Sequence, residues 1–107
     1  MAEFDDRERA EEEKFKLDQE LEFKAQARRA KLVGLWAGEL MGLSGAAADD
    51  YAKSVVMADL EEPGPEDLFR KVRKDFDLQS IALSDHQIRA KMDECLAIAR
   101  QQIKAGT

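Results

Sequence analysis

Apolar residues recur along most of the chain at the three- and four-residue spacing of amphipathic helices. This spacing predicts four helices, over about residues 21–41, 46–60 and 65–76, and from residue 84 to Gly106. No stretch reads convincingly as a strand. Because the connections between the four segments are short, the pattern predicts an all-α protein built as a four-helix bundle.

Each predicted helix has an apolar face on which its core residues should lie. Those on the first helix are Leu21, Ala25, Leu32, Trp36, Leu40 and Leu43, and those on the second are Ala48, Tyr51, Ala52, Val55 and Val56. The third helix contributes Leu68, Phe69, Val72 and Phe76, and the fourth contributes Ile88, Met92, Cys95, Leu96, Ala99 and Ile103.

Helix ends are marked by local signals. Ser84 and Gln87 have the spacing of a capping box, in which each side chain bonds to the other residue's backbone amide. Pro65 suits the first position of the third helix, where its missing amide proton costs nothing. Ser44 is the expected N-cap of the second helix.

Residues 1–19 differ from the rest of the chain because they contain few large hydrophobic residues, among them Phe4 and Phe15, in a mostly acidic segment. The segment is nevertheless rich in helix-forming residues, with acid-first charge pairs at i, i+4 spacing. Isolated helices of this length are marginal in water. We therefore expect a mobile, helix-prone N-terminal arm at residues 1–19 that becomes ordered on a partner, joined to a helical bundle at residues 20–107.

Composition excludes several classes of protein. The formal net charge of −6 argues against a nucleic-acid partner, since binding to the phosphate backbone needs a basic face. Cys95 is the only cysteine, so the chain can form no internal disulfide and no cysteine-based zinc site, as expected in the cytoplasm. No apolar run is long enough to span a bilayer, and the N-terminus lacks the apolar core of a signal peptide. We therefore expect a protein that is neither secreted nor inserted in a membrane.

Catalytic and metal-binding constellations are not evident. His86 is the only histidine and lacks the companions that a catalytic triad or a metal site requires. Glycine-rich phosphate loops are absent, so no catalytic residue, metal or cofactor is assigned. Three clustered cations leave open a weak contact with a nucleotide such as ATP or ADP; they are Arg28, Arg29 and Lys31.

Several blocks, in order along nearly the whole chain, carry a resemblance to a known family. They are Phe4-Asp5-Asp6-Arg7-Glu8, Glu22-Phe23-Lys24-Ala25 through Arg28-Arg29, Leu35-Trp36-Ala37, Glu62-Pro63-Gly64, Asp67-Leu68-Phe69-Arg70-Lys71, and Ser84-Asp85-His86 through Lys91-Met92-Asp93-Glu94. Together these blocks resemble the zeta subunits of alphaproteobacterial F-type ATP synthases.

The resemblance implies an inhibitor of the catalytic head of ATP synthase, which suppresses ATP hydrolysis. In that family the N-terminal segment inserts as a helix between the catalytic subunits and the central shaft. The implied partners are the alpha, beta and gamma subunits, with the protein held in the cytoplasm, at the periphery of the inner membrane, through the head.

Within the arm, the residues expected to contact the partner are of two kinds. Large apolar side chains would be buried in a partner groove, and charged ones would set the register. The expected anchors are Phe4 and Phe15, and the expected polar contacts are Asp5, Asp6, Arg7, Glu8 and Arg9. The alternative hypothesis is a nucleotide sensor, in which Arg28, Arg29 and Lys31 bind ATP or ADP and the arm is a solvated tail.

Overall fold

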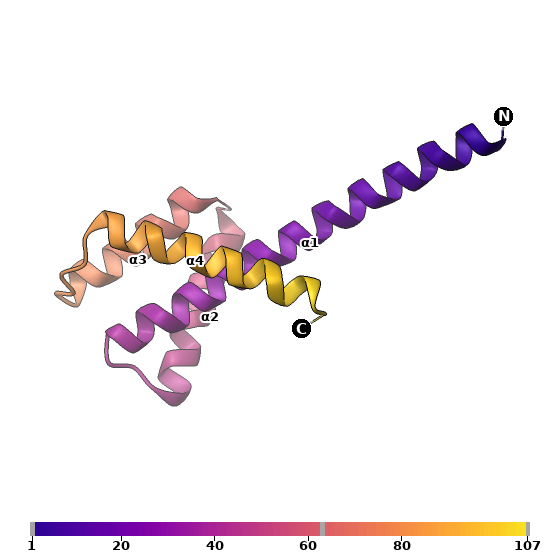
Figure 1. The fold of residues 1–107 in the computed structure, drawn as a ribbon. Helices are drawn as coiled ribbons and strands as arrows, with labels where there is room; N and C mark the ends of the chain where they lie inside the picture. Colours follow the sequence, from indigo (N-terminus) through magenta and orange to yellow (C-terminus); the bar gives the residue numbers. More distant parts are fainter. Residues whose placement is uncertain (1, 63, 107) are drawn as a thin grey trace.

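The computed structural model describes the backbone of residues 2–62 and 64–106 and the side chains of residues 18–62 and 64–106. The described residues form four helices and no strand (Figure 1), which confirms the predicted all-α class. The helices are α1 (Ala2–Leu40), α2 (Gly45–Glu61), α3 (Pro65–Leu78) and α4 (Asp85–Lys104). The last three agree with the predicted ranges to within a turn.

Helix α1 begins far earlier than the predicted start near Leu21, because the backbone from Ala2 onward belongs to the same helix. Residues 2–19 form its N-terminal half, which projects beyond the end of α4 (Figure 1). This projection makes the molecule 65 Å long but only 26 and 22 Å across. The radius of gyration is 17.4 Å, against about 13 Å for a compact chain of this size. The mobility expected of residues 1–19 stays a prediction.

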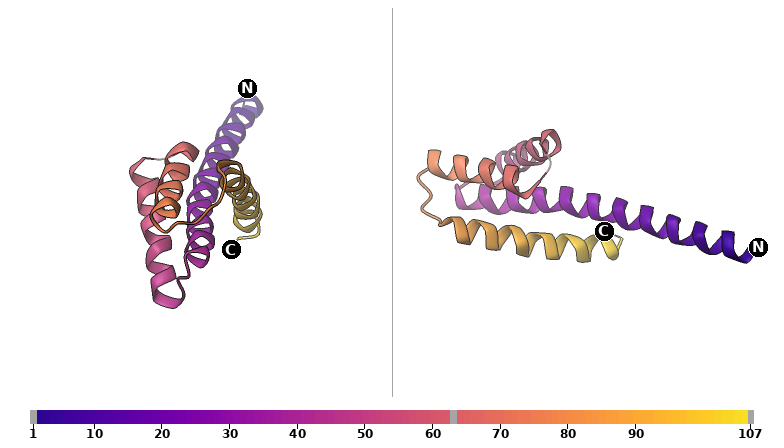
Figure 2. Two further views of the ribbon diagram at one scale, coloured as in Figure 1. Left: turned by 90° about the vertical axis from the view of Figure 1, so that its left-hand side faces the viewer. Right: turned by 90° about the horizontal axis from the view of Figure 1, so that it is seen from above.

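The folded body consists of α2, α3, α4 and the part of α1 that follows residue 19. It is built around α1, which lies between α2 on one side and α4 on the other (Figure 2). Helix α4 runs back along α1, so the C-terminal end of α4 lies beside the middle of α1 (Figures 1 and 2). Helix α3 packs against α2 and α4 near the other end of the body. Since α1 has neighbours on two sides, it must bury more than one face.

The core confirms most of the predicted faces. The predicted residues of α3 are all buried, as are four of those on α4; they are Leu68, Phe69, Val72, Phe76, Ile88, Met92, Cys95 and Ala99. Leu96 is only partly buried. Trp36 of α1 packs edge-on against Phe76, with ring centroids 5.5 Å apart and an interplanar angle of 70°, which is a favourable aromatic geometry.

The predicted face of α1 was partly wrong. Leu40, expected in the core, is 42% exposed, and Leu32 and Trp36 are only partly buried. The buried positions of α1 are mostly small residues on two faces, namely Ala25, Ala30, Val33, Gly34, Ala37 and Gly38. A single stripe could not describe this helix because helices pack against it from opposite sides.

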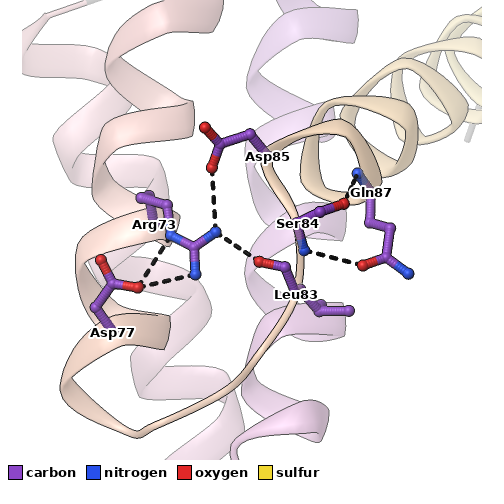
Figure 3. A network of polar contacts seen from close by, with 6 residues as sticks. All are labelled: Arg73, Asp77, Leu83, Ser84, Asp85 and Gln87. Carbon is purple, nitrogen blue, oxygen red and sulfur yellow. Dashed lines mark hydrogen bonds and ion pairs between the residues drawn. The ribbon is translucent and has the colours of Figure 1, made fainter.

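The helix caps match their signals in part. The amide of Gln87 donates to Ser84 Oγ at 3.1 Å, and the amide of Ser84 donates to Gln87 Oε1 at 2.9 Å, which confirms the capping box (Figure 3). Pro65 is the first residue of α3, as predicted. Ser44 occupies the N-cap of α2, but its side chain accepts no capping hydrogen bond.

Arg73 secures the loop between α3 and α4. Its guanidinium donates to Leu83 O at 2.6 Å and to Asp85 at 3.2 Å, and pairs with Asp77 on its own helix (Figure 3). These bonds hold the end of the loop against α3, beside the capping box that starts α4.

Candidate interaction site

The N-terminal half of α1 holds the residues expected to contact a partner. Phe4, Asp5, Asp6, Arg7, Glu8, Arg9 and Phe15 all belong to its helical backbone, but their side chains lie outside the described residues. Positions 4 and 15 are three turns apart and fall within about 20° of each other around the axis, since each residue of an α-helix turns about 100°. The helical backbone thus places positions 4 and 15 on one side of the helix axis.

The arm joins the folded body where α4 ends. Glu22 of α1 pairs with Arg100 of α4 through two bonds, 2.6 Å between Oε1 and Nη2 and 3.1 Å between Oε2 and Nε. The hydrogen bond from Arg100 lowers the pKa of Glu22, although desolvation partly opposes it. Nearby, Arg28 Nη1 donates to Gln102 Oε1 at 3.3 Å. The first pair joins residues 78 positions apart in the sequence and the second joins residues 74 positions apart. Both pairs therefore connect the end of α4 to α1.

Phe23 is an exposed aromatic residue that the sequence pattern did not single out. It is 64% exposed and lines a shallow depression with Gln19, Glu20 and Lys24. It lies four positions after the arm ends, on the part of α1 whose side chains are described. The signal that could have found it is its spacing, because Phe23 falls off the stripe formed by Leu21 and Ala25.

The three cations considered for nucleotide binding lie in different surroundings, and their role in binding stays a prediction. Arg28 bonds to Gln102 of α4, whereas Arg29 is only 5% exposed. Lys31 lies elsewhere, on a groove of about 570 Å³ between α1 and α2. Arg28 and Arg29 are successive residues, which point about 100° apart on a helix, so one can bond to α4 while the other is buried.

The groove between α1 and α2 has an apolar lining with charged residues added. Leu35, Ala52, Val56 and Met57 supply its apolar part, and Lys31, Lys53 and Asp49 its charged part. Its volume lies within the usual range for small-molecule sites. Lys53 was not among the predicted ligands, because only the packing of α2 on α1 brings it to the same groove as Lys31.

Arg29 and Asp59 are charged residues that the fold buries. Asp59 is 7% exposed, and desolvation raises its pKa, against the opposing effects of Arg29 and of a hydrogen bond from the backbone of Gly64. Arg29 Nε and Asp59 Oδ1 have no hydrogen-bond partner among the described atoms. Burial also raises the pKa of Cys95, which favours the neutral, unreactive thiol.

The described residues contain no group of three or more histidine, cysteine, aspartate or glutamate side chains placed to hold a metal ion. His86 is exposed in the first turn of α4. In the same part of the chain, no helix has the length and apolar character needed to cross a membrane.

Comparison with known proteins finds a matching family model and matching solved structures. A family model described as ATPase inhibitor subunit zeta matches residues 1–102. A solved structure described as "Solution NMR structure of the protein" is 44% identical, with a TM-score of 0.69. The match covers 81% of this chain and 99% of that one. The search of curated proteins returned no match.

Proposed function

The chain belongs to the ATPase inhibitor subunit zeta family, and from this membership we propose that the arm, residues 1–19, is its inhibitory element. The family is one of regulatory subunits rather than enzymes, and inhibition of the ATPase implies binding to ATP synthase. The proposed mechanism of inhibition is that the arm inserts as a helix into the catalytic head, between the alpha and beta subunits and the gamma shaft.

The observation that carries this proposal is the continuity of α1. One helix runs from the folded body into a segment that projects beyond the end of α4 (Figure 1). A helix wedged between catalytic subunits and a rotating shaft opposes the rotation on which hydrolysis depends. The folded body, anchored through the same helix, would remain outside the head.

The composition of the arm supports a role in binding. Few large apolar residues are available there to stabilise the arm on its own, so ordering it costs conformational entropy. Burial of Phe4 and Phe15 on one helix face would offset that cost in the complex. The charged positions from Asp5 to Arg9 would select the register along the groove.

Removal of the arm tests this function. A protein lacking residues 2–19 should keep its thermal melting transition, because the buried residues that the structure describes all lie later in the chain. It should also lose inhibition of ATP hydrolysis by the purified synthase head. Full inhibition by the truncated protein would place the activity in the folded body instead.

A second candidate function is nucleotide sensing at the groove between α1 and α2. The observation that favours it is the presence of Lys31 and Lys53, from two helices, on one largely apolar groove. The apolar part would accept a base and the lysines the phosphates. Titration of ¹⁵N-labelled protein with ATP should then shift amides at the groove, with weaker binding in Lys31→Ala and Lys53→Ala. Lys74→Ala, at an exposed position on α3, is the control. Absence of such shifts would reject this candidate.

A further inference from the structure

The ion pair between Glu22 and Arg100 lies where α1 leaves the folded body. Around it, Asp18, Leu21 and Ala25 of α1 and Ile103 and Lys104 of α4 line a hollow of about 300 Å³. Residues 18–20 on the arm side are exposed. The ion pair is therefore among the last contacts that α1 makes with the folded body before the arm begins.

We propose that the Glu22–Arg100 pair sets the direction in which the arm leaves the folded body, so that both residues are positioning residues for inhibition. This inference rests on the proposed function, since it concerns how the arm is presented to the ATP synthase head. Neither residue needs to touch the partner for the effect to arise.

The geometry of the pair suits this role. An arginine that meets a carboxylate through two parallel bonds fixes orientation as well as distance. Here the two bonds measure 2.6 and 3.1 Å, and they join helices that are distant in sequence. The side chain of Gln26, one turn further along α1, also lowers the pKa of Glu22 and so favours its charged form. Glu22 is thus held in its charged form against α4.

The length of the arm amplifies any change at its base. From position 22 to position 4 the helix rises about 27 Å, at about 1.5 Å per residue, so a tilt of about 10° would move position 4 by about 5 Å. Packing of a side chain in a groove is disturbed by far smaller shifts, on the order of 0.5 Å. A contact that contributes little to stability, as exposed ion pairs usually do, can therefore still affect docking.

The chain offers a matched control pair. Glu66 of α3 and Arg89 of α4 also form two bonds, at 2.9 and 3.1 Å, through the two terminal nitrogens of the arginine, and both residues are exposed. This pair joins α3 to α4 rather than α4 to α1. Glu66→Gln therefore removes the same kind of interaction without altering the base of the arm.

The first measurement is inhibition of ATP hydrolysis by the purified synthase head. Glu22→Gln should raise the concentration needed for half-inhibition about two- to fivefold, the range expected for loss of an exposed pair. Glu66→Gln should leave it unchanged. The charge-reversed double variant E22R/R100E should restore most of the loss, because it rebuilds the pair in the opposite sense.

The second measurement is made on the free protein and does not depend on activity. Spin labels on cysteines introduced at Ala10 in the arm and Ala97 on the exposed face of α4 report the distance between arm and body; the native Cys95 is buried. The distance distribution should broaden or shift in Glu22→Gln, stay unchanged in Glu66→Gln, and recover in E22R/R100E.

The two measurements separate the possible failures. An unchanged distance distribution in Glu22→Gln, or inhibition equal to that of Glu66→Gln, would overturn the positioning role while leaving the inhibitory arm intact. Full inhibition by the protein lacking residues 2–19 would instead overturn the proposed function. In that case the Glu22–Arg100 pair would have no positioning role in inhibition, whatever the spin-label distances show.

Discussion

Gly34 of α1 faces the backbone of Ala52 on α2 so closely that a Cβ atom at position 34 would lie 2.8 Å from Ala52 Cα. The same added atom would lie 3.2 Å from Val55 Cβ. Real Cβ atoms are essentially never found so near to backbone, so only glycine allows the two helices this approach. The contact fixes how α2 sits on α1, and with it the groove that contains Lys31 and Lys53.

Substitution of Gly34 should therefore separate the two helices. Gly34→Ala should lower the free energy of unfolding by about 1–3 kcal/mol, the usual cost of overpacking a core. Gly38→Ala is the matched control, because its Cβ would meet Tyr51 at an ordinary 3.6 Å and alanine favours the helix. Urea titration of both variants checks the prediction. Equal stability of the two would show that α2 shifts freely on α1.

The two serines at helix N-caps should respond differently to removal of the hydroxyl group. Ser84→Ala should cost about 0.5–2 kcal/mol, because the Gln87 amide loses its acceptor. Ser44→Ala should cost less, since the Ser44 side chain makes no capping bond. Inhibition should survive both changes. The comparison is a denaturant melt of each variant, and a larger loss for Ser44→Ala would contradict it.

Local signals explain which parts of the fold could be predicted. The capping box at Ser84, the proline at position 65 and the apolar spacing on α3 and α4 depend on neighbours within a turn or two, so the sequence displays them directly. The face of α1 was harder to predict because it depends on how many helices surround it. Small residues such as Ala30 and Ala37 give a weak hydrophobic signal although they are fully buried.

In the candidate sites, too, features that depend on neighbouring residues could be predicted, whereas features that depend on packing between helices could not. The contrast between residues 1–19 and the periodic segments is visible in the sequence, so the arm could be proposed from it. By contrast, the pairing of Glu22 with Arg100 joins positions 78 residues apart and arises only when α4 returns along α1. Helical spacing alone would likewise predict an exposed Arg29. The residue is buried because helices pack on two sides of α1.

The buried carboxyl group of Asp59 should make stability depend on pH. Because desolvation raises its pKa in the folded state, the folded protein disfavours ionisation of this group. Its contribution is therefore fully present below the ordinary pKa of 3.8 and decreases as pH rises through the raised folded value. Relative to the parent, Asp59→Asn should be more stable at pH 7 than at pH 4. Unfolding in urea at both pH values tests this, with the exposed Asp50→Asn as control; a relative stability of Asp59→Asn that falls between pH 4 and pH 7 would contradict it.

The last prediction assigns the binding energy of the arm to two side chains. Replacing Phe4 and Phe15 together with aspartate should abolish most inhibition, because two aromatic anchors on one helix face are lost and two charges would have to be desolvated in the partner's groove. The melting transition of the folded body should stay unchanged, since both positions precede its core. Leu78→Asp is the matched control: Leu78 is 72% exposed, at the end of α3, so the change removes an exposed apolar side chain outside the arm. ATP hydrolysis by the purified head, measured across a concentration series of each variant, compares them directly. If the double variant inhibits as well as Leu78→Asp and the parent, then Phe4 and Phe15 are not the anchors. The exposed ring of Phe23, which lies at the base of the arm, would be the next side chain to test.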